Sequence, residues 1–511
     1  MLRAAALAAL SLLAALVVAC GSGAASGDAD PASAVPADAM VYTEFVVRPS
    51  GDVRDDALEA IGKTLNTDDP AGKVQELLDR AFSQHGGHLD YDKDVKPWLG
   101  DRAGAWLGSR LDSDGDPTGA VIVATTDPDA ALDAFHKSTS AGKLTSHSYN
   151  GTDYEVDKDG DATGIVDGFL VGGPEPEFKR TVDAVRGDSL AENDRYRKSV
   201  DTLEDKRLAH FYVDLRRFFQ MAMKGDPRSA QAFEQLQALV PLGKLPPLVG
   251  SFAADGDRLA LDVSLEGFNS TALGGLGGLG GTTPLIKELP GDSWAAFGAP
   301  KYGRQLKAML DQFAGAFGGA AARAQLQQQY GIDLDEDILS WIGDVAFFVR
   351  GNSIPALGGG AVIEVTDSGK AANGFGKLVG LMQAAGGVHV QPVTIKGAKT
   401  AFSLKDQTTP KPIVMARSDD RVVITYGADA AVEALSPSTK LGGAPLYDEA
   451  KSALEDTDPG LLASVPAIVK LVEAAAPPDP DFATVRPYLE AYDAIALGYG
   501  DGRARFAVGL K

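Results

Sequence analysis

One stretch of the sequence occurs twice, and this repetition constrains the fold more than any other feature. LDYDKDVKPWLGDRAGAW begins at Leu89, and IDLDEDILSWIGDVAFFV begins at Ile332 and aligns with it without a gap. The repetition predicts a duplication, with two homologous units in tandem. The shared residues that we take as anchors of this structural repeat are Asp94, Trp98, Gly100 and Asp101 in the first copy and Asp337, Trp341, Gly343 and Asp344 in the second.

The aspartates of this stretch predict the start of a short helix. A carboxylate such as that of Asp90 caps free backbone N–H groups and faces the positive end of the helix dipole. Val95, Trp98 and Leu99 follow at the spacing of one apolar helix face, and Gly100 is expected to end the helix in the left-handed conformation. In the second copy, residues 345–349 form a continuous apolar run, which predicts a strand that is buried on both faces.

A calcium site is the alternative use of Asp90, Asp92 and Asp94. The EF-hand loop requires a glycine at its sixth position and a glutamate at its twelfth. Counted from Asp90, these positions hold Val95 and Asp101, and the acidic runs at 112–116 and 157–161 also lack the glutamate. We therefore interpret these aspartates as caps and turns, and we predict no metal ion or cofactor.

Residues 1–19 predict a lipoprotein signal peptide. Arg3 supplies its positive region, and the apolar run at 4–18 is shorter than the roughly 20 residues of a transmembrane helix. Residues 17–20, VVAC, resemble the lipobox of bacterial lipoproteins, which implies a diacylglycerol on Cys20, the only cysteine of the chain. A plain secretory signal with an incidental cysteine is the alternative. With the lipid, the protein would be anchored to the cell membrane on its extracytoplasmic face.

The remaining chain divides into a tether, two units and a linker. Residues 20–35 are small and weakly apolar, which predicts a flexible tether. The first unit is expected at 36–268 and the second at 285–511, with a Gly/Leu-rich linker at 269–284. Hairpin turns such as Asn150-Gly151 alternate with helical stretches, and the similar strands GAVIVAT and GAVIEVT begin at Gly119 and Gly360. The pattern predicts an α+β fold in which each unit is a mostly antiparallel sheet with helices packed on it.

The charge balance narrows the choice of partners. The 70 acidic residues exceed the 48 basic ones and give a formal net charge of −22. This excess argues against nucleic acid or an anionic membrane surface as the main partner. A single cysteine also excludes an intramolecular disulfide, so burial must stabilise the fold.

Few residues suggest catalysis. Gly291-Asp292-Ser293 is similar to the opening motif of a family of serine esterases, but that chemistry needs a histidine late in the sequence, and the last one is His389. We interpret this motif as a structural turn. The histidines at 85 and 88 could contribute to a metal site, but no third ligand recurs at helical spacing, so a solvent-exposed loop is preferred. The glycines at 374, 376 and 380 fall in a predicted helix and indicate close helix packing rather than a nucleotide-binding turn.

The lipobox, the tether and two units that each carry a P-x-D start and a W-[LI]-G-D element together resemble a family of bacterial lipoproteins. This is domain-of-unknown-function family thirty-three fifty-two, and the resemblance would cover residues 36–511. It implies no established activity. Our leading hypothesis is a non-enzymatic binding or envelope-associated lipoprotein whose partner is a protein, a peptide or a lipid, held in a groove between the two units. A substrate-binding lipoprotein of a transporter is the alternative, and a hydrolase is the third choice.

Overall fold

The computed structural model describes residues 29–85, 89–113, 115–139, 144–222, 245–268, 281–314, 319–385, 389–405, 409–475 and 480–511. The chain forms two compact units, Met1–Gly267 (unit 1) and Phe268–Lys511 (unit 2). The predicted signal peptide, Cys20 and most of the predicted linker lie outside the described residues.

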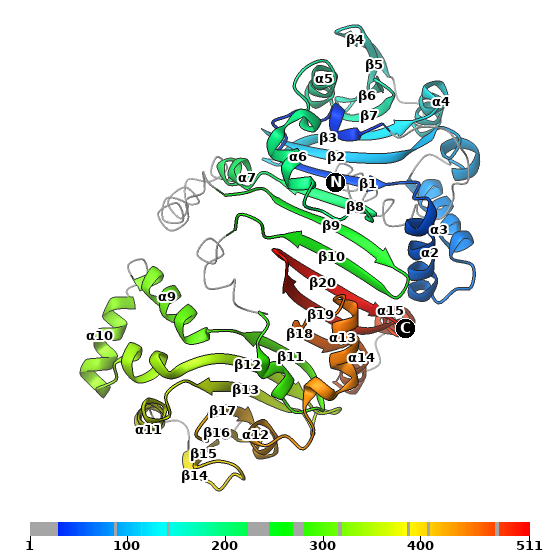
Figure 1. Cartoon of the computed structure of the whole chain (residues 1–511). Coiled ribbons are helices and arrows are strands. Elements are labelled where there is room, and N and C mark those ends of the chain that lie inside the picture. The colour runs from blue at the N-terminus through cyan, green and yellow to red at the C-terminus, as the bar shows by residue number, and fades with distance from the viewer. Residues whose placement is uncertain are drawn as a thin grey trace. The chain divides into compact units, whose positions relative to one another are not determined.

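The same order of elements recurs in the two units (Figure 1). The described elements of unit 1 are η2 Pro31–Ala34, β1 Val41–Val46, α2 Gly51–Leu65, α3 Pro70–His85, η3 Tyr91–Val95, β2 Leu99–Leu111, β3 Pro117–Thr125, α4 Pro128–Ser138, β4 Thr145–Tyr149, β5 Thr152–Val156, β6 Asp161–Val166, β7 Phe169–Pro174, α5 Glu175–Ala184, η4 Leu190–Glu192, α6 Asp194–Val200, β8 Ala209–Val213, α7 Leu215–Ala222, β9 Leu248–Asp255 and β10 Arg258–Ser264. The described elements of unit 2 are η7 Pro284–Glu288, β11 Ser293–Ala299, α9 Tyr302–Ala314, α10 Gly319–Tyr330, η8 Leu334–Ile338, η9 Leu339–Trp341, β12 Ile342–Arg350, β13 Gly358–Val365, α11 Ser368–Ala385, β14 His389–Pro392, β15 Thr400–Lys405, β16 Ile413–Arg417, β17 Arg421–Tyr426, α12 Ala428–Leu435, η10 Leu441–Gly443, α13 Pro445–Ala453, β18 Pro459–Ser464, α14 Val465–Ala475, α15 Pro480–Leu489, β19 Tyr492–Gly500 and β20 Arg503–Leu510.

Each unit is built on one antiparallel sheet, as predicted. In unit 1 the neighbouring strands are β10, β9, β8, β1, β2, β3, β7, β6, β5 and β4. In unit 2 they are β20, β19, β18, β11, β12, β13, β17, β16, β15 and β14. Every strand pair within these described parts is antiparallel. The predicted tight turn at Asn150-Gly151 is confirmed, because both residues have positive φ, 47° and 74°.

Each unit has two apolar cores, which lie on opposite faces of its sheet. In unit 1 one core contains Tyr42, Trp106 and Phe178, and the core on the opposite face contains Trp98 and Leu78. Alternation along the strands explains the division, since successive side chains point to opposite faces of a sheet.

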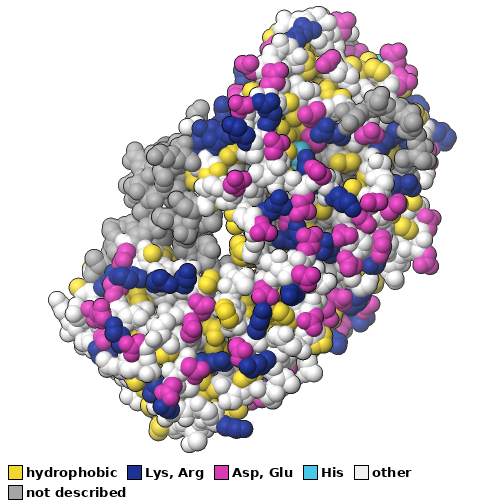
Figure 2. Space-filling view, viewed as in Figure 1, with side chains coloured by type: hydrophobic (Ala, Val, Ile, Leu, Met, Phe, Trp, Pro, Cys, Tyr) yellow, Lys and Arg dark blue, Asp and Glu magenta, His cyan; other side chains and the backbone are white. Residues whose placement is uncertain are grey.

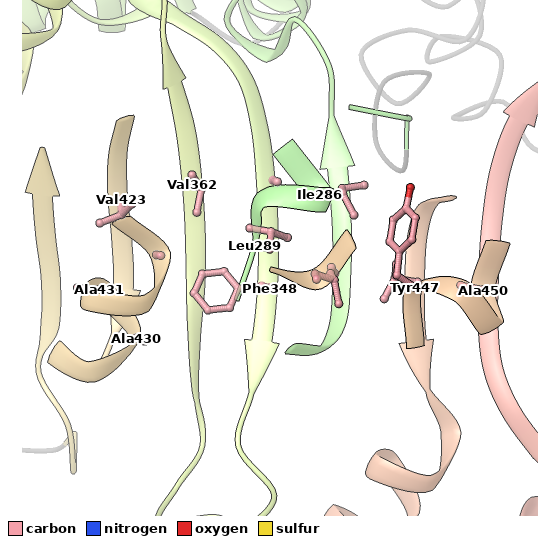
Figure 3. Packing of buried hydrophobic residues seen from close by; sticks show 14 of the residues in the cluster. Ile286, Leu289, Phe348, Val362, Val423, Ala430, Ala431, Tyr447 and Ala450 are labelled. Atoms are coloured by element: carbon pink, nitrogen blue, oxygen red, sulfur yellow. The ribbon is translucent and has the colours of Figure 1, made fainter. Parts of the chain in front are cut away.

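Unit 2 repeats this arrangement with smaller side chains. Figure 3 shows Phe348 and Val362 of the sheet packed beneath Ile286 and Leu289 of the η7 segment and beneath Ala430 of α12. The opposite core groups Trp341 with Phe375 of α11 and with residues of the outer strands. We call the face of the unit 2 sheet that bears Phe348 its sealed face.

The predicted tether is wrong in its last residues. Pro31–Ala34 forms a 3₁₀ turn that begins at Asp30, whose side chain accepts a hydrogen bond from the backbone N–H of Ala32 at 3.0 Å. Ala32, Ala34 and Val35 are fully buried in the core of unit 1. Proline at the first helical position and a capping aspartate fix this turn locally, and a sequence of small residues fits a crowded core as well as it fits a tether. In unit 2, Thr283 and Pro284 begin the corresponding turn η7.

Candidate functional site

The aspartates of the repeated stretch cap a helical turn in both units, which confirms the capping interpretation. The Asp90 carboxylate accepts a hydrogen bond from the backbone N–H of Lys93 at 3.1 Å, and the Asp94 carboxylate accepts one from the backbone N–H of Asp90 at 2.9 Å. In unit 2 the Asp337 carboxylate accepts from the backbone N–H of Asp333 at 2.8 Å in the same way. Each turn, η3 and η8, is a single π-helical turn. The two carboxylates of each turn therefore satisfy its free N–H groups from both sides.

The two anchor tryptophans lie in matching surroundings. Trp98 is 7% exposed and Trp341 is 1% exposed. The indole N–H of Trp98 donates to the carbonyl of Asp94 at 2.7 Å, and that of Trp341 donates to the carbonyl of Asp337 at 2.8 Å. Each tryptophan therefore buries its ring without leaving its donor unpaired.

A lysine from the following helix reaches each inner aspartate. Lys137 of α4 pairs with Asp94 at 2.6 Å, and Lys377 of α11 pairs with Asp337 at 2.5 Å. The hydrogen bond from the lysine is the largest cause that lowers the pKa of each carboxyl, Asp94 and Asp337. These residues hold the helix against the turn, which is a structural role.

The predicted role of Gly100 as the end of a helix is wrong, and its repeat partner Gly343 has no such role either. Neither ends a helix with a positive φ, because both lie in strands, β2 and β12. A Cβ at Gly100 would lie 2.7 Å from the carbonyl oxygen of Ala124, and one at Gly343 would lie 2.6 Å from the carboxylate of Glu364. These glycines allow close approach of the neighbouring strand.

Asp101 and Asp344 do not share a role. The Asp344 carboxylate accepts hydrogen bonds from the Thr283 hydroxyl at 2.5 Å and from the backbone N–H of Lys301 at 2.8 Å, so it ties the start of unit 2 to β12. Asp101 contributes its backbone carbonyl, which accepts from the N–H of Val47 at 2.7 Å. Of the three helical glycines, Gly374 packs closely as expected, because a Cβ there would lie 2.0 Å from the carbonyl oxygen of Asp337, whereas the other two have open space.

The esterase-like motif is placed as a structural turn. Ser293 is 3% exposed at the start of β11, and Asp292 forms an ion pair with Arg350 at 2.6 Å. A buried hydroxyl beside a carboxylate that is already paired cannot meet a substrate. Of the two candidate metal-ligating histidines, His88 and the side chain of His85 lie outside the described residues. Among the described residues, no group of three or more His, Cys, Asp or Glu side chains could hold a metal ion.

Unit 1 contains a buried polar cluster that the sequence did not reveal. The Tyr42 hydroxyl donates to Glu44 at 2.7 Å, and Arg102 donates to the same carboxylate at 2.8 Å. Tyr196 and His210 form a hydrogen bond at 3.0 Å, and burial, followed by the charges of nearby arginines, lowers the pKa of His210 to about 3. Glu44 and His210 are each 4% exposed. The cluster is internally paired and enclosed, so we interpret it as part of the core.

A second group of polar residues lines an open hollow of about 600 Å³ in unit 1. His136 and Glu155 pair there at 2.6 Å, and the His147 ring stacks on Tyr154 with 5.6 Å between the centroids. Both pairs are satisfied within the hollow.

The most distinctive surface of the described chain is an apolar pocket of about 610 Å³ in unit 2. Five adjacent strands form its floor, and no charged side chain lines it. The lining residues are Ala295, Ala296, Phe297, Phe347, Phe348, Val349, Gly360, Ala361, Ile424, Leu461, Leu462 and Ala463.

A single row of directly opposed residues crosses the floor of this pocket. The row, called here the apolar row, runs from β18 through β11, β12 and β13 to β17. Its members are Leu461, Phe297, Phe347, Ala361 and Ile424. Phe297 and Phe347 stack with 4.5 Å between centroids and 13° between planes. Since Phe348 faces the sealed core, the alternation of the strand places Phe347 on the opposite face, where it is only half-buried.

The prediction that residues 345–349 are buried on both faces is therefore wrong for one face. Ala346 and Phe348 on the sealed face are 0% and 2% exposed, but Phe347 and Val349 on the other face line the pocket. An apolar run shows that both faces avoid water, but not whether a helix or a ligand covers the second face.

Charge and hydropathy add two observations. Acidic and basic side chains are interspersed on the face shown in Figure 2, so neither sign dominates that face. In the described part of the chain, no helix combines the length and the apolarity that crossing a bilayer requires.

A family model described as protein of unknown function (DUF3352) matches residues 2–462. The chain belongs to the DUF3352 family. This confirms the resemblance drawn from the repeated motifs, and it adds no activity, since the family has none assigned in its description.

Two solved structures resemble this DUF3352 member only distantly. No curated protein matches the chain. Two solved structures of TP0453, crystal forms III and I, match at 15% and 11% identity and cover 46% and 47% of this chain and 80% and 79% of their own. Their TM-scores are 0.24 and 0.21, and a superposition of that quality carries no argument about function.

Proposed function

We propose that this DUF3352 protein is a non-enzymatic lipoprotein, anchored to the extracytoplasmic face of the cell membrane, that binds an apolar ligand or the apolar part of a lipid in unit 2. The observation that carries the proposal is the apolar row with its stacked pair Phe297 and Phe347. A pocket of about 610 Å³ lies within the range of 300–1,000 Å³ that is typical of small-molecule sites.

An unoccupied apolar floor is energetically unfavourable in water. Covering apolar surface stabilises a protein by about 25 cal/mol per Å², and contiguous exposed apolar patches on soluble proteins commonly mark binding sites. The central strands could have been sealed as their opposite face is, by Ile286, Leu289 and the helices of that core. We infer that the open face is kept for a ligand.

The alternatives receive less support. A substrate-binding lipoprotein of a transporter would need two lobes with parallel sheets, whereas the strand pairs described within each unit are antiparallel. A hydrolase would use the paired groups of unit 1, but Glu44 and His210 are enclosed and already bonded to neighbours. Cofactors are not part of the proposal.

The proposal includes a duplication of one ancestral unit. Supporting it are the matching strand orders, the reciprocal caps at Asp94 and Asp337, and the equivalent hydrogen bonds of Trp98 and Trp341. One copy would then have acquired the ligand site while the other kept a closed polar core.

The anchor has its own test. The lipobox-like VVAC places Cys20 where the apolar run ends. We expect Cys20→Ala to release the protein from the membrane or to leave it as an unprocessed precursor, measured by membrane fractionation and by the mass of the purified chain. Unchanged processing and retention would contradict lipidation at this residue.

The ligand site is tested with a variant and its matched control. Phe347→Ser removes half of the stacked pair. Ala105→Ser changes the corresponding position of unit 1, which pairs with Thr43 of β1 as Phe347 pairs with Phe297 of β11. With a fluorescent fatty acid as the probe, we expect Phe347→Ser to weaken binding about 10- to 100-fold, as expected for the loss of a buried phenyl group, and Ala105→Ser to leave it unchanged. Equal binding by both variants and the parent would show that the pocket is not the site.

A further inference from the structure

The apolar row gives the pocket a length. Its members lie directly opposite one another on five adjacent strands, from Leu461 on β18 to Ile424 on β17. Neighbouring strands are about 4.8 Å apart, so four spacings span about 19 Å across the sheet.

The same registers give the pocket a width. Along each strand the lining extends over only one or two outward-facing positions, such as Phe347 and Val349 on β12 or Leu461 and Ala463 on β18. Two residues of a strand cover about 7 Å. The floor is therefore a narrow trough that runs across the strands, with roughly three times more length than width.

One end of the trough is closed and the other is open. Beyond Ile424 the row continues to Met415 on β16, which is 1% exposed and is covered together with Phe375 of α11. Beyond Leu461 it continues to Leu497 on β19 and Phe506 on β20, and Phe506 is 41% exposed. A linear ligand can therefore enter over β19 and β20 but cannot pass the β17 end.

We propose that the ligand is a single unbranched acyl chain, with its methyl end at Ile424 and its head group beyond Leu461. The inference rests on the proposed function and specifies the ligand of that site. A carbon chain with bonds of about 1.5 Å and near-tetrahedral angles advances about 1.25 Å per carbon, so 19 Å holds about 15 carbons.

The lining favours a single chain. Two acyl chains lying side by side need more width than a trough of about 7 Å provides. The lining contains no charged side chain to recognise a head group, so specificity has to come from the length of the chain.

A chain-length series tests this proposal. The mature chain from Cys20 to Lys511, produced without lipid, is titrated calorimetrically with saturated straight-chain fatty acids of 8 to 20 carbons below their aggregation concentrations. We expect affinity to rise about fourfold per added methylene and to level off at about 15 carbons, where the chain leaves the trough. Alkyl alcohols and lysophospholipids of the same lengths should level off at the same point, because the head group lies outside.

Two variants move the limit, and one leaves it in place. Ile424→Trp fills the closed end and should shorten the limit by one strand spacing, about four carbons. Ala105→Ser, at the position of unit 1 that corresponds to Phe347, should not change it. If Ile424→Trp does not fold, Ala361→Phe obstructs the next position of the row and should shorten the limit further.

The outcomes separate this inference from the proposed function. A steady rise in affinity through 20 carbons, or an unchanged limit in both shortened variants, would overturn the acyl-chain assignment while apolar binding stands. Tighter binding by a rigid polycyclic probe than by any chain would do the same. No binding of any chain or apolar probe by the parent would overturn the proposed function itself.

Discussion

The two units use the same strand order but differ in their sheet faces. Unit 1 has a line of buried polar residues on one face, and unit 2 has a stacked aromatic pair on the other face. On the face that carries the apolar row in unit 2, unit 1 has a row whose two central members are small. The members of this row are Phe211, Thr43, Ala105, Val121 and Gly172. Thr43 and Ala105 occupy the positions of the stacked pair Phe297 and Phe347, so unit 1 lacks this stacked pair.

The other face shows the reverse difference. Unit 1 carries Glu44, His210 and Ser251 in one line across β1, β8 and β9, and all three are buried. In unit 2 the positions of Glu44 and Ser251 hold Gly298 and Gly498. A Cβ at Gly298 would lie 2.5 Å from the carbonyl oxygen of Gly281 and 2.5 Å from Cγ2 of Thr283, so this position is closed by tight packing and not by charge.

The difference separates the features that both units share from those that differ between them. The caps, the buried tryptophans and the strand registers recur because they fix the position of a helix on a sheet. The rows between them are free to change, since antiparallel pairing tolerates many side chains as long as one face stays apolar. Unit 1 is therefore specialised towards a closed core and unit 2 towards an open pocket.

The largest effect is expected when the anchor tryptophan of either unit is removed. Trp98→Ala and Trp341→Ala should each lower the free energy of unfolding of their own unit by about 3–5 kcal/mol, the usual cost of deleting a buried tryptophan. Hydrogen exchange read by mass spectrometry follows the two units separately in the whole chain. Costs that differ by more than about 2 kcal/mol would contradict equivalent anchors.

The polar core of unit 1 predicts a pH dependence that unit 2 should lack. The pKa of His210 is about 3 in the folded protein and about 6.5 when unfolded, so between these values only the unfolded chain binds the proton. Stability is therefore full above about pH 6.5 and falls as the pH decreases, by about 2 kcal/mol between pH 6.5 and 5. Hydrogen exchange of unit 1, followed against urea concentration at several pH values, should show this loss of stability. His210→Gln should remove the slope, and a slope that persists would assign it to other groups.

The smallest effect is expected at the capping aspartates, Asp90 in unit 1 and Asp333 in unit 2. Asp90→Ala and Asp333→Ala should each cost about 1 kcal/mol, because each removes one side-chain acceptor from a helix start. The matched Asp→Asn variants keep an acceptor and should recover most of the loss. Thermal unfolding measures both, and a full loss with asparagine would show that charge, and not capping, matters there.

Local signals predicted much of the frame. Capping aspartates, the Asn150-Gly151 turn and alternating apolar strands depend on neighbouring residues, and they lie in the structure where the sequence placed them. The register of the central strands was not predictable in the same way. GAVIVAT and GAVIEVT align by letters from Gly119 and Gly360, but Trp106 pairs with Ala120 while Phe348 pairs with Gly360. In the structure Gly360 therefore corresponds to Ala120 and not to Gly119, a shift of one residue.

A bulge causes the shift. Between Leu99 and Ala103, β2 carries one residue more than β12 carries between Ile342 and Val345. The ungapped match of the repeated stretch therefore ends near Gly100, and Ala103 lies in a different core from Ala346. A one-residue slip exchanges the two faces of a strand. The sequence also did not predict the pocket. Tertiary packing decides which face of a sheet the helices leave uncovered, and the strand sequence alone does not show it.

The 3₁₀ turn that docks Pro31–Ala34 into unit 1 also limits the length of a tether between Cys20 and the folded unit. Only nine residues lie between Cys20 and the capping Asp30, so even a fully extended segment would hold that point within about 35 Å of a lipidated cysteine. With the lipid on Cys20 that we propose, a tether this short would keep the start of unit 1 near the bilayer surface. Acyl chains taken up by such a protein would come from the membrane that carries it.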